Sequence, residues 1–377
     1  MVERKPKVLS LILSFKLGGI AISSLRFIRS TQDDFEHFVV GRKISNDQDL
    51  MVLEDFKKFS RECYDIDVSR FRFVSVYQLI KVVWNVKPEI IHVHSKGGAL
   101  YGVFIKLLYW RKFKLFYTTH GFYITYTGVF HRLHMVFERV INKLSTKTIT
   151  VSKSERSFYL QTTKCPPQKT IIIPNGVEVE KKQLPNSLAE VLSKYSVNIV
   201  SLSRIDPAKD LVTMLKVFDN LEAKSVALHI IGGYVFDKPS QRDYKDKVDA
   251  LLSLSKKKND IFFWGDVPFA GNFLHAFQVY WSTSISEGLP TGIIEAMFSR
   301  LLIIGSNCRG NVDLIEDKVT GFLTPVGDVS IITENLVEAI DSLGEELSER
   351  LIENAFEKAQ EFGVERSSKK LADLYFE

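Results

Sequence analysis

The sequence predicts an α/β protein of two domains, each built on a doubly wound parallel sheet. Short β-branched or apolar runs alternate with segments of helical periodicity along the whole chain, which is typical of parallel α/β layers. Many of these runs are apolar at nearly every position, as expected for strands that are covered on both faces. At 377 residues the chain is also longer than one ordinary hydrophobic core organises, so two domains of similar size are expected.

The first half contains five predicted strands, at residues 8–13, 38–41, 90–94, 115–119 and 148–151. Helical patterns occupy residues 99–109 and 130–144 between them. A further strand ends at Ile173-Pro174-Asn175-Gly176, where Pro and Asn-Gly are strong turn signals and a polar stretch follows. We therefore place an N-terminal Rossmann-like domain at residues 1–176.

The second half repeats the pattern with six predicted strands, at residues 198–203, 227–231, 261–263, 279–283, 302–306 and 321–324. Helices are expected at 211–221, 241–256, 291–298 and 331–343. This set defines a second Rossmann-like domain at residues 177–363. In open α/β sheets ligands bind outside the carboxyl ends of the strands, so the site residues are expected there.

Composition excludes several classes of protein. The chain contains no run of about eighteen apolar residues, so a membrane-spanning helix is not expected. The basic start does not continue as a signal peptide, because Lys16 interrupts the apolar run and no clear cleavage site follows. Three widely spaced cysteines, Cys63, Cys165 and Cys308, favour neither a disulfide framework nor a zinc site. We therefore expect a protein of the reducing cytoplasm.

Charge is distributed unevenly between the two halves. Residues 1–176 carry 28 Lys and Arg against 14 Asp and Glu, a net charge of +14, whereas residues 177–377 carry 22 against 31, a net charge of −9. This asymmetry predicts that the first half faces something anionic, such as a lipid head group, a diphosphate or a nucleic acid. A solvated basic surface is the alternative.

The segment from Ser284 to Met297 carries the most chemical information. It leaves a buried strand, passes through Gly288-Leu289-Pro290 and enters a helix at Thr291, so free backbone N–H groups at the helix start can bind phosphate. Glu287 lies in the loop at the strand tip, and Glu295 lies about one turn inside the helix. Carboxylates are poor phosphate ligands, so we expect these two to accept hydrogen bonds from sugar and ribose hydroxyls.

Two further loops of the second half carry polar or glycine signals. Arg204 and Lys209 follow a strand and are separated by one tight turn, so both cations can converge on one diphosphate. Gly232-Gly233 follows the predicted strand at residues 227–231. Val267 lies in the loop after the predicted strand at residues 261–263. Glycine after a strand is also ordinary turn chemistry, so these last loops are the weaker signals.

In the first half, Gly18-Gly19 follows the first strand and opens a helix, where glycine allows a phosphate or an acceptor to approach the backbone. A plain tight turn is the alternative, because the full Gly-x-Gly-x-x-Gly spacing is absent. His120 ends another strand. His92 and His94 share one face of a strand, and without a nearby third ligand we expect core or acceptor-side positions for them rather than a metal site.

The Glu-x7-Glu spacing of Glu287 and Glu295, followed by Ala296-Met297, resembles the donor-site motif of glycosyltransferase family 4. That family is retaining and has the GT-B fold of two facing Rossmann-like domains with a cleft between them. The resemblance implies that Glu287 lies near the transferred sugar and that Glu295 holds the ribose hydroxyls. Arg204 and Lys209 resemble the family's Arg-x4-Lys pair, which neutralises the departing nucleoside diphosphate.

The same resemblance assigns roles to the remaining loops. His120 would hydrogen-bond the donor sugar. The segment 364–377 resembles a C-terminal helix that packs back onto the first domain, although an ordinary last helix of the second domain fits equally. The residues expected to line the donor site are Gly288, Leu289, Pro290, Thr291, Gly232, Gly233 and Val267.

The implied activity is that of a retaining hexosyltransferase in bacterial polysaccharide or lipopolysaccharide synthesis. It would move a hexose or N-acetylhexosamine from a nucleotide sugar, a UDP-sugar rather than a GDP-sugar, to a glycan acceptor that is lipid-linked. No Asp-x-Asp motif occurs in the second half, so we expect no metal and no cofactor. Two alternatives stay open: a nucleotide-sugar hydrolase or epimerase of the same fold, and a non-catalytic partner subunit. A dinucleotide dehydrogenase is disfavoured by the missing glycine fingerprint.

Residues 106–114 combine four cations with aromatic and aliphatic side chains, a composition typical of an interfacial helix. Together with the basic first half, this segment predicts peripheral attachment to the anionic inner face of a membrane, with no nucleic-acid partner. A buried helix leading into a basic turn is the alternative, because a strand follows at once.

Overall fold

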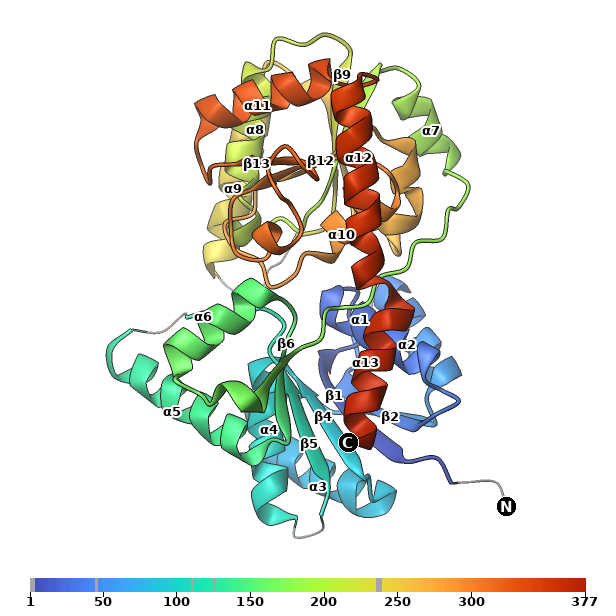
Figure 1. Ribbon diagram of the computed structural model, residues 1–377, viewed down its shortest axis with the longest axis vertical. Helices are drawn as coiled ribbons and strands as arrows, with labels where there is room; N and C mark the ends of the chain where they lie inside the picture. The colour runs from blue at the N-terminus through green and yellow to red at the C-terminus, as the bar shows by residue number, and fades with distance from the viewer. Residues whose placement is uncertain (1–3, 45–46, 110–111, 125–126, 235–238) are drawn as a thin grey trace. The chain divides into compact units, whose positions relative to one another are not determined.

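The computed structural model describes residues 4–44, 47–109, 112–124, 127–234 and 239–377. The chain divides into two compact units, and Figure 1 labels most of their helices and strands. Unit 1 comprises Met1–Val177 and Gly363–Glu377, and unit 2 comprises Glu178–Phe362. Each unit has its own sheet and its own hydrophobic core, so the predicted fold class of two parallel α/β sheets is confirmed.

Unit 1 contains a seven-stranded sheet in the order β3-β2-β1-β4-β5-β6-β7, and every strand pair is parallel. The chain first builds outward from β1 to β3 and then returns to place β4 on the other side of β1. This reversal creates a topological switch point between β1 and β4. The strands are β1 (Lys7–Ser14), β2 (Glu36–Arg42), β3 (Glu62–Asp65), β4 (Ile90–His94), β5 (Lys114–Thr118), β6 (Lys147–Thr150) and β7 (Thr170–Ile172).

Helices cover both faces of this sheet because successive residues of its strands alternate between two cores. In β1, Val8 and Ile12 belong to one core, and Leu9 and Leu11 belong to the other. The first core is closed by α1 (Gly19–Ser30), α2 (Asp47–Phe59) and α13 (Val364–Phe376). The second is closed by α3 (Phe73–Val86), α4 (Ser95–Leu108) and α5 (Gly128–Leu144). The helix α6 (Lys153–Thr163) joins β6 to β7.

Unit 2 repeats the design with a six-stranded parallel sheet in the order β10-β9-β8-β11-β12-β13. Its switch point lies between β8 and β11, and Trp281 on β11 is completely buried in its core. The strands are β8 (Val197–Leu202), β9 (Val226–Ile231), β10 (Ile261–Gly265), β11 (Val279–Ser282), β12 (Leu302–Ser306) and β13 (Phe322–Thr324). The helices are α7 (Asn186–Leu192), α8 (Leu211–Asn220), α9 (Pro239–Leu254), α10 (Thr291–Phe298), α11 (Val329–Asp341) and α12 (Glu346–Ala359).

The last helix, α13, belongs to unit 1 although the whole of unit 2 precedes it in the sequence. Leu371, Leu374 and Tyr375 enter the core beneath α1, and the Tyr375 ring packs edge-on against Phe27 and Phe35. Among the helices of the described ranges, none combines the length and the apolar character that crossing a bilayer requires.

Candidate functional site

The most closely connected part of unit 2 lies at its switch point, where β8 and β11 run side by side. Val279 pairs with Ile199 and Tyr280 with Val200, so the loops that follow the two strands leave the same edge of the sheet. Lys209 from the first loop and Glu287 from the second form an ion pair, with 2.5 Å between Nζ and Oε1. Both side chains are mostly buried, at 19% and 13% exposure. A cation and a carboxylate therefore meet where doubly wound folds bind their ligands.

The loop that carries Lys209 is tied to the end of β11. The Thr283 hydroxyl donates to the carbonyls of Lys209 and Asp210, and the Ile285 N–H donates to the Ala208 carbonyl at 2.8 Å. These bonds give hydrogen-bond partners to backbone carbonyls of a tight turn. They also fix the position of the Lys209 backbone relative to Glu287.

Arg204 has a different partner from Lys209. Its guanidinium contacts the Asp206 carboxylate at 3.1 Å and is 58% exposed, so most of it faces solvent. Asp206 is buried, and its Oδ1 also accepts from the Ala208 N–H at the start of the short helix Pro207–Lys209. Asp206 therefore orients Arg204 and shapes the turn towards Lys209. That both cations converge on one diphosphate stays a prediction.

The Glu287 loop packs against the loop that follows β12. The Glu287 N–H donates to the Arg309 carbonyl, and the Arg309 guanidinium donates to the Ser286 hydroxyl at 3.1 Å. Gly310 has a φ of 89°, and a Cβ built there would lie 2.7 Å from Cβ of Glu287. Only glycine fits this close contact without a shift. Arg309 places a third cation beside the Glu287 loop.

The helix α10 begins directly after this loop. Gly288 and Leu289 are buried. Pro290 occupies the N-cap position of α10, but its side chain has neither a donor nor an acceptor. The first backbone N–H groups of α10, beginning at Thr291, therefore have no side-chain cap from Pro290. An N-terminus of this kind attracts anions.

Glu287 and Glu295 both act electrostatically on the buried Tyr280 hydroxyl. Burial raises the pKa of the Tyr280 hydroxyl, and the charges of Glu287 and Glu295 raise it further. A Cβ at Gly292 would lie 2.4 Å from this hydroxyl, and a Cβ at Gly271 would lie 2.8 Å from Oε2 of Glu295. The two glycines thus leave the space that Tyr280 and Glu295 occupy.

The glycine pair after β9 adjoins the Arg204 loop. The Ile205 N–H donates to the Gly233 carbonyl, and a Cβ at Gly232 would lie 2.4 Å from the Ser203 carbonyl oxygen. The Gly233 N–H donates to the Asp266 carboxylate at 2.7 Å, which connects this loop to the one that contains Val267. Val267 is half-buried. The structure therefore groups the loops after β8, β9 and β10.

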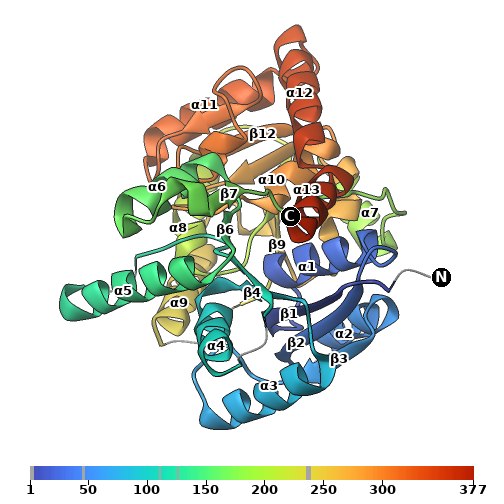
Figure 2. The same ribbon diagram turned by 60° about the horizontal axis from the view of Figure 1, so that its bottom comes forward.

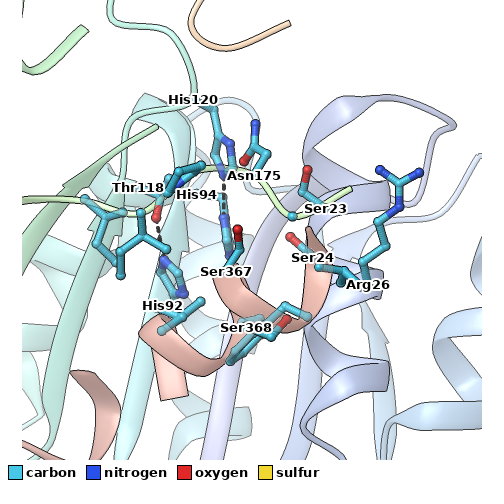
Figure 3. Close-up of a pocket in the computed structure, with 18 residues that line it drawn as sticks. Ser23, Ser24, Arg26, His92, His94, Thr118, His120, Asn175, Ser367 and Ser368 are labelled. Atoms are coloured by element: carbon cyan, nitrogen blue, oxygen red, sulfur yellow. Dashed lines mark hydrogen bonds between the residues drawn. The ribbon is translucent and has the colours of Figure 1, made fainter. Parts of the chain in front are cut away.

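Unit 1 contains a pocket at the carboxyl ends of its central strands, lined by both polar and apolar side chains and shown in Figure 3. Three histidines line it. His94 and His120 are hydrogen-bonded through Nδ1 and Nε2 at 2.8 Å, and the rings of His92 and His94 lie 4.1 Å apart. His92 bonds the Thr118 hydroxyl at 2.7 Å and the Tyr375 hydroxyl on α13 at 2.5 Å.

The histidines of this pocket are held neutral. Burial lowers the pKa of His92 to about 3 and that of His120 to about 4. For His120, a hydrogen bond with Asn175 partly opposes this lowering of the pKa. Burial also lowers the pKa of His94, and its two histidine neighbours add to the effect. Neutral imidazoles can both donate and accept, so this wall of the pocket suits hydroxyl groups.

The opposite wall comes from α1 and α13. Ser23, Ser24 and Ser367 point their hydroxyls into buried surroundings, and within the described part of the chain these three oxygens have no hydrogen-bond partner. Ser10, Arg26 and Ser368 also line the pocket. Buried hydroxyls without partners are costly, so a polar ligand or water in the pocket would stabilise them.

Gly18 and Gly19 lie at the start of α1, at the switch point of unit 1. Gly18 is the N-cap residue, and its φ of 171° is extended backbone open to any residue type. A Cβ at Gly19 would have no atom within 4 Å, and one at Gly18 would meet only the Lys16 carbonyl at 4.0 Å. Packing within the chain therefore does not require glycine at these two positions. That a ligand approaches the backbone there stays a prediction.

Two protein-family models match the chain, one in each unit. The model described as Glycosyl transferases group 1 matches residues 189–358, and the one described as Glycosyltransferase Family 4 matches residues 17–181. The chain belongs to glycosyltransferase family 4. The predicted family and a retaining mode of transfer are thereby confirmed.

Relatives of this glycosyltransferase include enzymes of O-antigen and of capsular polysaccharide biosynthesis. The chain is 23% identical over 312 residues to the Escherichia coli UDP-Gal:alpha-D-GlcNAc-diphosphoundecaprenol alpha-1,3-galactosyltransferase, covering 81% of this chain and 78% of that one. It is 25% identical over 249 residues to the E. coli O-antigen biosynthesis glycosyltransferase WbnH, covering 65% and 66%. Among solved structures, Anabaena Alr3699/HepE in complex with UDP-glucose superposes with a TM-score of 0.80 over 98% of both chains at 18% identity, which shows the shared fold.

The structure corrects the interpretation of residues 106–114. Tyr109 and Phe113 are buried in the core of unit 1, and Lys106 donates to the Phe113 carbonyl while its ammonium lies over the Phe113 ring. Lys114 donates to the Tyr375 carbonyl. Residues 110–111, including Arg111, lie outside the described residues. Two of the aromatic rings expected at a membrane surface here, those of Tyr109 and Phe113, are instead part of the core. The strand β5 begins directly after Phe113, at Lys114.

Sequence reasoning missed the residue that holds the His120 loop. Glu155 on α6 is fully buried, and its Oε1 accepts from the Thr119 hydroxyl and from the backbone N–H groups of Gly121 and Phe122, at 2.7–2.8 Å. Its Oε2 accepts from the Val151 N–H. The signal available was Ser152 three residues earlier, whose hydroxyl accepts from the Glu155 N–H as an N-cap.

Within the described ranges, no group of three or more His, Cys, Asp and Glu side chains has an arrangement that could hold a metal ion. His92, His94 and His120 do come together, which the sequence alone did not indicate. Both ring nitrogens of His92 are engaged, with Thr118 and with Tyr375, and Nδ1 of His94 is hydrogen-bonded to Nε2 of His120. A metal-independent reaction stays a prediction.

Proposed function

We propose that this enzyme transfers a hexose or N-acetylhexosamine from a UDP-sugar to a lipid-linked glycan acceptor, in bacterial surface polysaccharide synthesis. The Lys209–Glu287 pair at the switch point of unit 2 is the observation that carries the proposal. It joins one cation suited to a diphosphate with one carboxylate suited to sugar hydroxyls. A relative supports the donor and the acceptor, since its name gives UDP-Gal as donor and a diphosphoundecaprenol-linked sugar as acceptor.

In this proposal the loops of unit 2 hold the donor. Arg204, Lys209 and the N-terminus of α10 receive the charge that develops on the departing UDP. Glu295 accepts hydrogen bonds from the ribose, and Glu287 accepts them from the transferred sugar. Lys209 exchanges part of its bond with Glu287 for a phosphate oxygen when the donor binds. The nucleotide site is completed by the backbone of the remaining loops, at Gly232, Gly233, Gly288, Leu289, Thr291 and Val267.

Transfer with retention needs little covalent chemistry from the protein. The bond between the anomeric carbon and the diphosphate oxygen breaks as an acceptor hydroxyl bonds to the same face of that carbon. The acceptor proton passes to a diphosphate oxygen of the leaving UDP. The enzyme contributes positioning and charge stabilisation, which together account for large rate effects.

The pocket of unit 1 is proposed to receive hydroxyl groups of the reacting sugars. His120 and Asn175 lie at its upper edge in Figure 3, and the unpartnered hydroxyls of Ser24 and Ser367 lie below them. The Ser23 hydroxyl, also without a partner among the described residues, lines the pocket as well. Gly18 and Gly19 would let the acceptor or its phosphate approach the backbone at the start of α1.

Ligand-induced stabilisation tests the donor assignment. UDP and UDP-sugars should raise the melting temperature of the enzyme more than GDP and GDP-sugars, because a ligand of the folded state stabilises it by mass action. Product analysis with and without a polyprenyl-diphosphate-linked sugar then separates a transferase from a hydrolase. Release of free sugar at the same rate under both conditions would contradict the proposal.

A further inference from the structure

We propose that the outward face of α5 is a membrane-contacting surface that holds unit 1 against anionic lipid. The inference deepens the proposed function, because a lipid-linked acceptor is presented at a bilayer surface. The surface proposed here differs from residues 106–114, where the rings of Tyr109 and Phe113 are buried, and lies in another part of the same unit.

An apolar stripe runs along the solvent side of α5. It consists of Val129, Phe130, Leu133, Val136 and Val140, whose exposure ranges from 38% for Val140 to 70% for Phe130. Scattered exposed apolar residues are ordinary, but these recur at helical spacing and face one direction. Figures 1 and 2 show α5 at the periphery of unit 1, between α4 and α6.

The other side of α5 is already packed. Met135 and Ile141 are buried, and Glu138 is fully buried with its carboxylate 3.1 Å from the His134 ring. Asn142 donates to the Thr148 hydroxyl at the end of the helix. The exposed stripe is therefore additional to what the fold of unit 1 needs, and a free apolar stripe of this kind marks an interaction surface.

A row of cations borders the stripe. Arg132, Arg139 and Lys143 are exposed and lie seven and four residues apart, so at 100° per residue they occupy one edge of the apolar face. The only acidic residue of α5, Glu138, points into the core. Arg139 is held in place because its Nε donates to the Thr163 carbonyl at 2.7 Å.

Apolar side chains beside a row of cations, without an exposed carboxylate, are the arrangement that binds anionic bilayers. A protein partner that fits the apolar stripe alone would leave the cations without a role. The same helical layer exposes further apolar side chains, namely Leu107 and Leu108 at the end of α4 and Phe73, Tyr77 and Trp84 on α3. Tyr and Trp favour the boundary between lipid and water.

Vesicle co-sedimentation of the full chain tests the inference. Wild-type protein should bind vesicles of phosphatidylglycerol and phosphatidylethanolamine at low salt, and it should bind pure phosphatidylcholine vesicles several-fold more weakly. Replacing Phe130, Leu133 and Val136 together with Ser should weaken binding to the anionic vesicles at least tenfold. The matched control replaces Leu254, Ile331 and Val337, exposed apolar residues of unit 2, with Ser and should bind like wild type.

A charge variant tests the role of the exposed cations of α5 in binding anionic lipid. Arg132→Gln with Lys143→Gln should remove most of the preference for anionic vesicles, and raised ionic strength should do the same to wild type. Both sets of variants should keep the wild-type melting temperature, because none of these side chains is buried. Wild-type affinity in the α5 serine variant, or a wild type that ignores anionic vesicles, would overturn the inference. A wild-type dimer that the serine variant converts to monomer, with vesicle binding unchanged, would do so as well.

These outcomes are separable from those of the proposed function. UDP affinity and transfer to an acceptor with a short, water-miscible chain should be the same in the serine variant and in wild type. If vesicle binding behaves as expected but no UDP-sugar binds, the proposed donor is wrong and the membrane surface stands.

Discussion

Replacing Glu155 with Gln should destabilise unit 1 although the two side chains have nearly the same shape. The carboxylate is fully buried and accepts four hydrogen bonds, three on Oε1 and one on Oε2. His120 and Gly121 next to it have positive φ values of 50° and 95°. Their turn directs consecutive N–H groups at Oε1, which is the geometry of an anion-binding nest.

The loss in the free energy of unfolding follows from the number of donors that the Glu155 carboxylate satisfies. If the Gln carbonyl keeps the place of Oε1, its NH2 group faces the Val151 N–H, so one buried donor loses its acceptor at a cost of about 1–3 kcal/mol. The three remaining bonds lose charge assistance, which costs somewhat less than 1 kcal/mol each. Relief of the desolvation of a buried charge offsets part of this sum. We expect a net loss of about 3 kcal/mol, equivalent to a melting temperature lower by about 6–12 °C for a unit of this size.

Calorimetry of the full chain measures the effect, with Glu222→Gln as the control because Glu222 is exposed. Transfer activity should fall as well, since the turn that positions His120 loses its support, whereas UDP affinity should be unchanged. A loss of less than about 1 kcal/mol at wild-type activity would show that solvent satisfies these donors, and the positioning role of Glu155 would be wrong.

Three further predictions concern the donor site and pH. Arg204→Ala and Lys209→Ala should each reduce kcat by about 10²–10³, because each removes charge stabilisation from the transition state; near-normal turnover in both would remove the diphosphate assignment. Glu295→Ala should weaken UDP binding in calorimetry, whereas Glu287→Ala should spare UDP and impair transfer; the reverse pattern would exchange their roles. The pKa of His92 is lower in the folded protein than in the unfolded chain, so its neutral form stabilises the fold above pH 6.5. This contribution to the free energy of unfolding is lost as the pH falls from 6.5 towards 3, by about 1.4 kcal/mol per pH unit. Denaturation midpoints measured from pH 7 to 4 should therefore decline less steeply for His92→Gln than for wild type.

The sequence predicted those elements whose residues are apolar on both faces. Strand β4 and helix α10 have the bounds that were expected, 90–94 and 291–298. The strand β3, Glu62–Asp65, was not predicted, because it lies at the edge of the sheet and none of its four residues is fully buried. Its pairing with β2 places it there, and pairing is a long-range property that local patterns do not contain.

The clustering of site residues depended on strand order in the same way. Lys209 and Glu287 follow strands that are far apart in sequence, and only the switch between β8 and β11 makes them neighbours. In unit 1, His94 pairs in register with Thr118, so the residue two positions beyond, His120, reaches the His94 ring. Composition and periodicity identified each residue type, but register and strand order decide which side chains meet.

The placement of α13 has a consequence for how the protein is made. His92 and Tyr375 are hydrogen-bonded although they are 283 residues apart in the chain. A ribosome therefore releases seven strands and six helices of unit 1, and then all of unit 2, before the helix that covers Phe27 and Phe35 exists. Until then one face of the first core is open to water, a state in which nascent chains depend on chaperones. Folding of unit 1 is thus completed only after unit 2 has been synthesised, so a chain cut short within unit 2 has neither a finished core nor a finished pocket.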